Sequence, residues 1–329
     1  MTRCTATDKP TIAILLATYN PRLDWLEEQL SSLNAQTYPN LKLYLRDDCS
    51  PDVPFTEIER LTEHCITRFP VSLLRNEENV GSDKTFERLT VEAEGEYFAY
   101  CDQDDIWLPE KLSVLEKTAR RENAVLVCSD TIVIDQDGTK LAESITEIRK
   151  RHIFLSGEGL APYLLVRNFV IGCTMLVDAK LAKKAVPFVE GYVHDQWIAV
   201  FAALHGTVFS VKEPLIRYRQ HDHNQTGILT GVSDKETYLE QRILHMQQTL
   251  LRVQARLTLQ QAAQAELPRQ IESYHAREAY FRKPGFRGAA ALLKNKELSR
   301  GAKLLELVLP LISERQFAAC VKLARSGKL

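Results

Sequence analysis

The residues best suited to chemistry follow an apolar, aromatic-rich run from Tyr97 to Cys101. Three carboxylates occur there within four residues, at Asp102, Asp104 and Asp105. Carboxylates this close repel one another, so their ionised forms need a cation or a solvated turn. The run is typical of a buried strand, and ligands bind at the carboxyl ends of strands in open α/β sheets. The segment predicts a divalent metal holding a phosphorylated ligand, with an acidic turn capping a helix as the alternative.

Polar residues suited to a nucleotide also follow three strands predicted earlier in the chain. Thr18 and Tyr19 come after the first, Asp47 and Asp48 after the second, and Arg75 after the third. The sequence contains neither a G-x-G-x-x-G after the first strand nor a G-x-x-x-x-G-K-[ST], which disfavours a dinucleotide dehydrogenase and a P-loop. A nucleotide here would be held by side chains and a metal, although each loop taken singly is more often an ordinary turn.

Taken in order, these motifs resemble one family. The series A-T-Y-N-P, R-D-D-C-S-P-D, R-N-E-E-N-V-G and C-D-Q-D-D-I-W-L-P-E-K-L is similar to the N-terminal half of family 2 glycosyltransferases with the GT-A fold. The tract from Val80 to Trp107 resembles the branch that includes bacterial rhamnosyltransferases. Further matches follow at Asn168, at residues 172–176, 194–197 and 218–221. The resemblance covers roughly residues 10–227 and does not extend beyond residue 233.

The resemblance implies how the nucleotide would be held. Asp47 or Asp48 would accept a hydrogen bond from the N3–H of a uracil or thymine, and Thr18 and Tyr19 would line the base and ribose. Three cations are candidate partners of the diphosphate. They are Arg75, Lys84 and Arg219.

The resemblance also implies a metal site. Asp102 and Asp104 would form the Asp-x-Asp pair, with Asp102 facing the ribose or a water and Asp104 binding Mg²⁺ or Mn²⁺. The metal would neutralise the leaving nucleoside diphosphate. His221 would contact the metal or the diphosphate, and Asp105 would contact the donor sugar or cap the following helix.

Asp195 occupies the position of the family's catalytic carboxylate, which implies that it is the general base for the acceptor hydroxyl. Without the other motifs, an acid at a predicted helix start is more typical of an N-cap. Gln196 departs from the two bulky residues usual after the His-Asp pair, and would alter acceptor choice rather than the chemistry. The residues expected on the acceptor side are His194, Gln196, Trp197, Gly172 and Cys173.

The implied reaction is an inverting, metal-dependent transfer of a sugar from a nucleotide to a hydroxyl. The branch implies dTDP-rhamnose as first-choice donor, with UDP-sugars open, and a bacterial surface polysaccharide or lipid-linked oligosaccharide as acceptor. One alternative is a carboxylate-pair hydrolase, which has no use for the nucleotide loops. The other is an inert nucleotide-sugar-binding module, which the presence of Asp102, Asp104, Asp195 and His221 disfavours.

Alternating strands and helices would position these residues. Apolar runs at residues 11–17, 41–45, 71–74, 97–101 and 124–128 predict buried strands, and helices are expected through 26–33, 55–69 and 84–93. Pro109 and Glu110 predict the start of a further helix. This alternation indicates an α/β fold of GT-A type, with a Rossmann-like, mostly parallel central sheet flanked by helices. Later strands are expected at 131–134, before a turn at Asp137–Gly138, and at 169–177 and 207–211, the last two separated by a helix through Trp197.

The pattern predicts a catalytic domain over residues 1–232 and a helical region over 233–329. Residues 233–236 form a predicted capping box. An apolar seam follows at Leu239, Ile243, Met246, Leu250, Val253 and Leu257. The seam predicts a helix packed on the catalytic domain, with self-association as the alternative. From residue 282 onward, eleven Lys and Arg against three Glu give +8 beside the apolar run 304–309. This region either lies on an anionic membrane face or is a helical cap with solvated lysines.

Bulk composition narrows the class of protein. A net charge of −1 argues against a general nucleic-acid binder. The seven cysteines form no C-x-x-C pair, which predicts reduced thiols and no zinc site. The N-terminus lacks an apolar signal core, and no run approaches membrane-spanning length. We therefore expect a cytoplasmic protein, peripheral on the inner membrane face if the basic region binds lipid.

Overall fold

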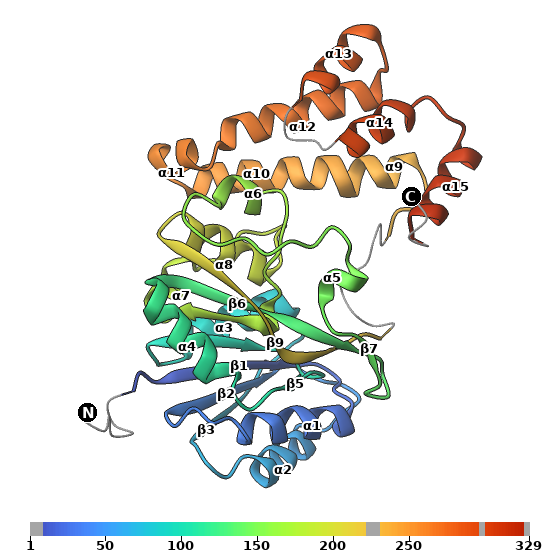
Figure 1. Ribbon diagram of the computed structural model, residues 1–329. Coiled ribbons are helices and arrows are strands. Elements are labelled where there is room, and N and C mark those ends of the chain that lie inside the picture. The colour runs from blue at the N-terminus through green and yellow to red at the C-terminus, as the bar shows by residue number, and fades with distance from the viewer. Residues whose placement is uncertain (1–8, 222–230, 296–299, 326–329) are drawn as a thin grey trace. The chain divides into compact units, whose positions relative to one another are not determined.

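The computed structural model describes residues 9–221, 231–295 and 300–325 (Figure 1). The chain forms two compact units. The first comprises residues 1–188 and 192–222, and the second comprises residues 189–191 and 223–329.

The first unit contains one mixed sheet with the strand order β3-β2-β1-β4-β8-β6-β9-β5, and β7 pairs with β6. The strands are β1 (Ile12–Thr18), β2 (Leu41–Asp47), β3 (Val71–Arg75), β4 (Tyr97–Cys101), β5 (Ile106–Trp107), β6 (Ala124–Ile134), β7 (Lys140–Ala142), β8 (Met175–Asp178) and β9 (Thr207–Arg219). β1 to β4 are mutually parallel where they pair, as are β6 and β9, whereas β8 runs antiparallel to both β4 and β6. The expected mostly parallel sheet of an α/β fold is confirmed.

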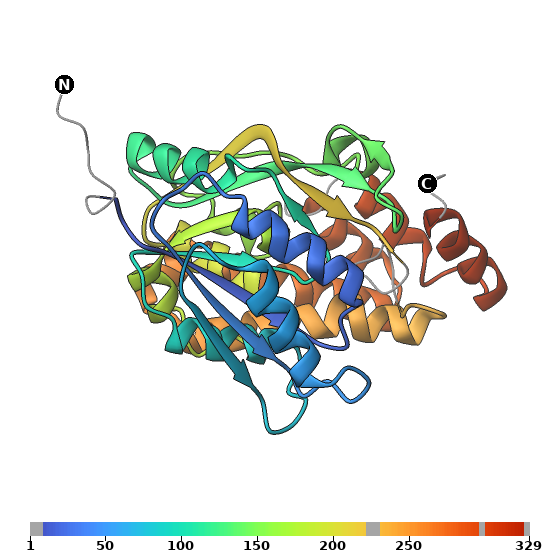
Figure 2. The ribbon, with the colours of Figure 1, turned by 90° about the horizontal axis from the view of Figure 1, so that it is seen from below.

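Helices cover both faces of this sheet. They are α1 (Leu23–Asn34), α2 (Phe55–Cys65), α3 (Ser82–Glu92), α4 (Lys111–Glu122), α5 (Ile145–Ile148), α6 (Ala161–Leu164), the 3₁₀ turn η2 (Gly172–Thr174), α7 (Ala179–Lys184) and α8 (His194–Ala203). The side chains of Ile12, Ile14 and Leu16 pack in one cluster with α1, α2 and α4, and the blue helices α1 and α2 lie over the strands in Figure 2. On the other face, Phe86 of α3 contacts Tyr100 of β4, with ring centroids 5.6 Å apart. Burial on both faces explains why these strands are continuous apolar runs.

Strand register aligns the carboxyl ends that carry the predicted nucleotide loops. Thr18 is paired with Asp47, and Asp47 with Arg75. Leu16 is paired with Cys101, the residue directly before the acidic turn. Residues that are far apart in sequence therefore meet at one edge of the sheet.

Several elements differ from the predicted boundaries. The helix expected to reach residue 69 ends at Cys65, where the next residue is extended. The strands expected at 124–128 and 131–134 are one strand, β6. β9 likewise continues past Pro214, because the missing N–H is accommodated by a register shift opposite Asp130. The strand expected over 169–177 is replaced by η2 and a shorter β8, since Thr174 donates its N–H to Ile171 O within a tight turn.

The second unit is helical. Its elements are α9 (Lys235–Tyr238), the π-helical turn η3 (Leu239–Leu244), α10 (His245–Arg256), α11 (Leu259–Gln264), α12 (Leu267–Arg282), α13 (Phe286–Lys294), α14 (Arg300–Val308) and α15 (Glu314–Arg325). The apolar seam is largely buried at Leu239, Ile243, Leu250 and Val253, and η3 and α10 pack against α12 (Figure 1). Within the described residues, no helix combines the length and apolar character needed to cross a bilayer.

The start of the second unit's first helix corrects one prediction. The N-cap is Asp234, whose carboxylate accepts the Thr237 N–H at 2.8 Å while the Thr237 hydroxyl accepts the Asp234 N–H. The capping box expected at Ser233 is therefore shifted by one residue. Asp234 has the extended backbone that an N-cap requires.

Candidate functional site

The acidic turn lies between β4 and β5, with its three carboxylates in different surroundings. Asp104 Oδ2 is 2.7 Å from His221 Nε2. Asp105 is fully buried, and its Oδ1 accepts the Arg219 N–H at 2.9 Å. Burial and the neighbouring Asp104 raise the pKa of Asp102 to about 6. The helix-cap alternative for Asp105 is wrong, because β5 follows it and α4 has Glu110 as its N-cap.

The chemistry of this donor set fits a divalent metal. Burial, followed by repulsion from Asp104 and Asp102, raises the pKa of Asp105 well above its ordinary value. A bound cation would relieve that repulsion. The Cys173 Sγ and carboxylate oxygens of Asp102 and Asp105 lie within 4.8 Å of one another. Because Mg²⁺ and Mn²⁺ prefer oxygen ligands and a thiol is soft, the Cys173 thiol is not expected to be a ligand. Asp102, Asp104 and His221 remain the predicted metal residues, with His221 Nε2 beside Asp104.

Asp47 holds the turn after β2. Its fully buried carboxylate accepts from the Thr18 hydroxyl at 3.2 Å, the Ser50 N–H at 3.0 Å and the Ser50 hydroxyl at 2.5 Å. Arg75 Nε lies 3.4 Å away, and Arg75 also donates to Ser50 O. Four protein contacts thus occupy the Asp47 carboxylate.

Asp48 holds the entry to α3. Its carboxylate accepts from Asn76 Nδ2 at 2.7 Å, from the Val80 N–H at 2.9 Å and from the Gly81 N–H at 2.8 Å. Gly81 has a φ of +86°, a conformation that favours glycine. A carboxylate offers about four acceptor sites, so Asp48 retains one more than Asp47 for a base N–H.

Tyr19 is joined to the acidic turn through Gln103. The Tyr19 N–H donates to Gln103 Oε1 at 2.8 Å, and Gln103 Nε2 donates to Tyr19 O at 3.2 Å. The Tyr19 residue is 45% exposed, which leaves its ring accessible to a base. Sequence reasoning gave Gln103 no role, although its place inside D-Q-D-D was a signal.

The three predicted diphosphate cations differ in exposure. Arg219 is buried, with Nε on Asp104 O at 2.8 Å and its other nitrogens on Asp135 O, Gln136 O and Glu28. Lys84 is exposed and pairs with Glu87 at 2.9 Å, and Arg75 is partly exposed. Arg219 therefore holds the acidic turn through Asp104 O and Asp105. We expect it to affect donor binding by positioning that turn rather than by contacting the diphosphate.

Asp195 lies on the second residue of α8, after the N-cap Val193, so the N-cap alternative is wrong. Its Oδ1 accepts from Asn168 Nδ2 at 3.0 Å, and its Oδ2 accepts the Gly172 N–H at 2.9 Å. Burial raises the pKa of the Asp195 carboxyl above its ordinary value. A general base benefits from such a shift.

His194 is fixed between aromatic rings and Asp83. Its ring stacks on Phe86 with centroids 4.1 Å apart, its backbone N–H donates to Asp83 Oδ1 at 2.8 Å, and its ring Nδ1 lies 3.4 Å from the same oxygen. Although burial lowers it, the hydrogen bond and charge of Asp83 together with Asp195 raise the pKa of His194 overall. A Cβ added at Gly172 would lie 2.8 Å from His194 Nε2, which explains the glycine there.

Two residues expected on the acceptor side bind the protein itself. Trp197 is fully buried and donates from Nε1 to Ala185 O at 2.8 Å. Because its indole is enclosed by protein and its N–H is already bonded, Trp197 is a core residue. Gln196 is partly exposed and donates to Leu164 O at 3.0 Å.

Sequence reasoning missed Lys111 altogether. This fully buried lysine begins α4 and donates from Nζ to Cys173 O at 2.5 Å. Burial lowers the pKa of Lys111 to about 7, against the opposing effect of Cys173, Cys101, Asp105 and Asp102. The signal was its fixed distance from the acidic turn in the motif D-Q-D-D-I-W-L-P-E-K.

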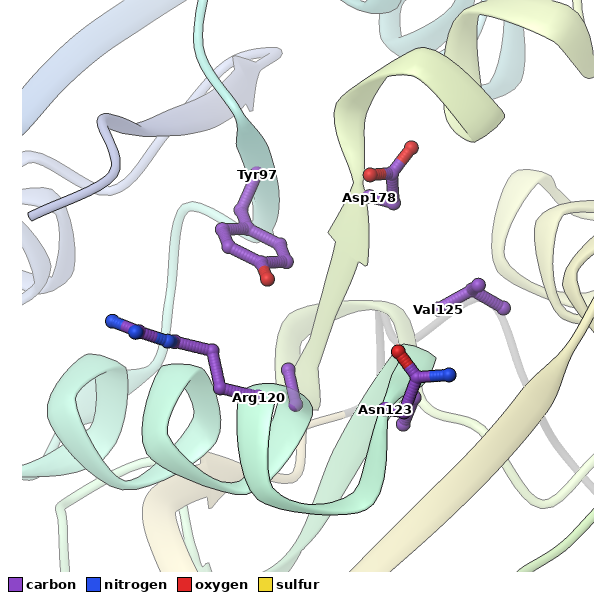
Figure 3. A pocket seen from close by; sticks show the side chains of 7 residues that line it. Tyr97, Arg120, Asn123, Val125 and Asp178 are labelled. Atoms are coloured by element: carbon purple, nitrogen blue, oxygen red, sulfur yellow. The ribbon is translucent and has the colours of Figure 1, made fainter.

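A cavity of about 320 Å³ lies elsewhere (Figure 3). Its lining residues are Tyr97, Ala119, Arg120, Asn123, Ala124, Val125 and Asp178. Tyr97 begins β4, whereas the acidic turn follows the other end of that strand. The cavity is therefore not part of the candidate site.

Comparison with known proteins identifies the family. The model of glycosyl transferase family 2 matches residues 13–184. The putative teichuronic acid biosynthesis glycosyltransferase TuaG of Bacillus subtilis is 28% identical over 52% of this chain, and the chain spans 63% of its length. The dTDP-rhamnosyl transferase RfbG of Shigella flexneri is 25% identical over 68% of this chain and 76% of its own length. The chain spans only 38% of a similar glycosyltransferase from Rickettsia felis, which is 24% identical over 72% of this chain.

Solved structures share the fold. S. aureus TarS 1–349 in complex with UDP-GlcNAc has a TM-score of 0.60 at 14% identity, covering 97% of this chain and 92% of that one. The mannosyltransferase PcManGT from Pyrobaculum calidifontis, in complex with GDP-Man and Mn²⁺, has a TM-score of 0.54 at 17% identity and covers 98% and 88%. With a family match over more than half of its length and this fold, the chain belongs to glycosyl transferase family 2 and has the GT-A architecture.

Proposed function

We propose that this chain transfers a sugar from a nucleotide donor to a hydroxyl, with inversion and with a divalent metal. The observation that carries the proposal is the position of η2. Its Gly172 N–H holds the candidate base Asp195, and its Cys173 thiol faces Asp102 and Asp105. One short turn thus brings the acceptor-side acid and the acidic turn together, as a transfer between two substrates requires.

The residues suggest how the steps are divided. Mg²⁺ or Mn²⁺, held by Asp102, Asp104 and His221, would supply neutralisation of the leaving diphosphate. Asp195 removes the proton of the acceptor hydroxyl as that oxygen attacks the anomeric carbon. Tyr19 and Asp48 orient the nucleobase of the donor, and Arg75 and Lys84 contact its diphosphate.

The donor we favour is dTDP-rhamnose. The residues from Val80 to Trp107 support it through their resemblance to the rhamnosyltransferase branch, and RfbG, named a dTDP-rhamnosyl transferase, is a relative. UDP-sugars are the alternative, since TarS was solved with UDP-GlcNAc. The acceptor we propose is a surface polysaccharide or a lipid-linked oligosaccharide.

A thermal-shift screen of nucleotide sugars, with and without Mn²⁺, tests the donor. A true donor stabilises the protein in proportion to the logarithm of its concentration over its dissociation constant. We expect dTDP-rhamnose with Mn²⁺ to give the largest shift. A larger shift with UDP-GlcNAc would replace the donor assignment, and no shift with any nucleotide sugar would contradict the transferase proposal.

We also propose that the helical region binds the anionic inner face of a membrane. Phe286 is 90% exposed and lies seven residues before Leu293, on the same face of α13. Leu304, Val308 and Leu311 are exposed at helical spacing on and just after α14. The basic residues around them include Arg282, Lys283, Arg287, Lys294 and Lys303. Such basic, apolar helices suit anionic lipid, whereas self-association through this face would place like charges together.

Flotation with liposomes containing phosphatidylserine tests the membrane proposal. We expect binding that weakens with salt and is lost in Phe286→Ser with Leu293→Ser. Leu259→Ser is the matched control, since Leu259 is 92% exposed on α11. Unchanged flotation of the double variant, or a salt-independent dimer in sedimentation, would contradict it.

A further inference from the structure

A buried lysine, Lys111, is hydrogen-bonded to the turn η2 of the candidate active site. Lys111 begins α4 and is 0% exposed, with its Nζ 3.0 Å from the centroid of the Trp107 ring. A lysine is rarely buried without a partner. Here the Nζ donates to Cys173 O, the central carbonyl of η2.

The turn that Lys111 holds carries contacts to both groups of acids. The residue before Cys173 binds Asp195 Oδ2 through the Gly172 N–H at 2.9 Å. The thiol of Cys173 lies within 4.8 Å of carboxylate oxygens of Asp102 and Asp105. A shift of this turn would therefore move the support of Asp195 and the wall of the acidic turn together.

The turn η2 also packs against β4, β6 and α8. Its internal bonds run from the Thr174 N–H and hydroxyl to Ile171 O, and β8, which follows it directly, pairs with β4 and β6. The bond from Lys111 is what ties the Cys173 carbonyl to the helix after the acidic turn. Because α4 begins six residues after Asp105, the hydrogen bond from Lys111 links the position of the acidic turn to the position of η2.

We propose that Lys111 is a positioning residue for the reaction, holding η2 so that Asp195 stays aligned with the acidic turn. The proposal depends on the proposed function, because it assigns Asp195 as the base. Loss of a group that orients metal ligands commonly costs about 10- to 100-fold in affinity or activity, and we expect a loss of that order at Lys111.

The test compares Lys111→Met with Lys117→Met, a change at an exposed lysine on the same helix. Hydrogen exchange of the amides at residues 172–174 gives a readout that needs no substrate. We expect faster exchange there in Lys111→Met, with exchange in β1 and β4 unchanged. Equal exchange in the two variants would overturn the proposal. If Lys111→Met does not fold, Lys111→Gln, whose shorter amide cannot reach the carbonyl equally well, takes its place.

Turnover separates positioning from general stability. With dTDP-rhamnose and Mn²⁺, we expect dTDP release by Lys111→Met to fall about 10- to 100-fold in kcat, with KM for the donor nearly unchanged. Adding Lys111→Met to Asp195→Asn should lower the rate no further, because both act on one group. A further multiplicative loss would overturn the proposal. Undiminished turnover of Asp195→Asn alone would instead refute the base assignment, whatever the exchange data show.

Discussion

At the scale of single residues, the site is a set of carboxylates with different tasks. Asp47 and Asp48 follow each other in sequence, yet one holds the turn after β2 and the other holds the entry to α3. Asp105 is buried against the Arg219 backbone, whereas Asp104 contacts His221. Environment thus assigns roles that residue type alone cannot, as burial and hydrogen bonds decide which carboxylate stays available to a ligand.

The base assignment gives a prediction at this scale. Asp195→Asn keeps the size of the side chain but cannot take a proton, so we expect transfer to fall about 10²- to 10⁴-fold with donor affinity retained. Burial raises the pKa of Asp195, and the base works only when ionised. Wild-type kcat/KM should therefore fall with decreasing pH at a higher pH than an ordinary aspartate would give. A pH–rate profile checks this, and an unchanged acid limb in Asp195→Asn would contradict it.

At the scale of elements, η2 shows what a sequence pattern leaves out. The apolar run at 169–177 predicts a strand, and periodicity carries no sign that Gly172 must approach His194 closely. β1, β2 and β4 were predicted within one or two residues because each is buried on both faces. Motif order brought Asp102, Asp104 and Asp195 into the prediction. Lys111, Gln103 and Asp83 escaped it, because their roles arise from contacts between elements.

Gly172→Ala tests the fit of η2. The added Cβ would stand 2.8 Å from His194 Nε2, so the turn or the ring must move. We expect a loss of about 1–3 kcal/mol in unfolding free energy and a larger proportional loss of turnover, since the Gly172 N–H supports Asp195. Thermal unfolding and steady-state kinetics measure the two. Gly301→Ala, where nothing lies within 4 Å of the added Cβ, is the control; equal behaviour of both variants would count against the fit.

The helical unit has a buried ion pair of its own. Arg277 on α12 donates from Nε to Glu306 Oε2 on α14 at 2.8 Å, and Tyr238 donates to the same carboxylate. Removing one partner leaves a buried charge, so Glu306→Ala should cost about 3–5 kcal/mol in unfolding free energy. Chemical denaturation checks this. Arg277→Met with Glu306→Leu should recover much of the loss, and failure of Glu306→Ala to destabilise would show that the pair is solvated.

At the scale of the whole molecule, the chain combines the family fold with a second, helical unit. The family model covers residues 13–184, so it ends before Asp195, His221 and the helical unit. The roles of Asp195 and His221 could therefore be inferred from the sequence only by motif order, and the helical region only by apolar spacing. Charge is also distributed unevenly along the chain. The excess of Lys and Arg lies after residue 282, whereas the predicted metal ligands and general base are mainly carboxylates.

Metal removal gives the prediction that belongs to this scale. Asp102, Asp104 and Asp105 repel one another at the end of β4, so a bound divalent cation should stabilise the first unit. We expect Mn²⁺ at 100 times its dissociation constant to add about 2.7 kcal/mol, and chelation to remove it. Asp104→Asn should abolish that response, whereas Asp178→Asn, an N-cap of α7, should leave it intact. Because repulsion between the carboxylates is what the cation offsets, a Mn²⁺ response that survives Asp104→Asn would place the metal at other residues of the chain.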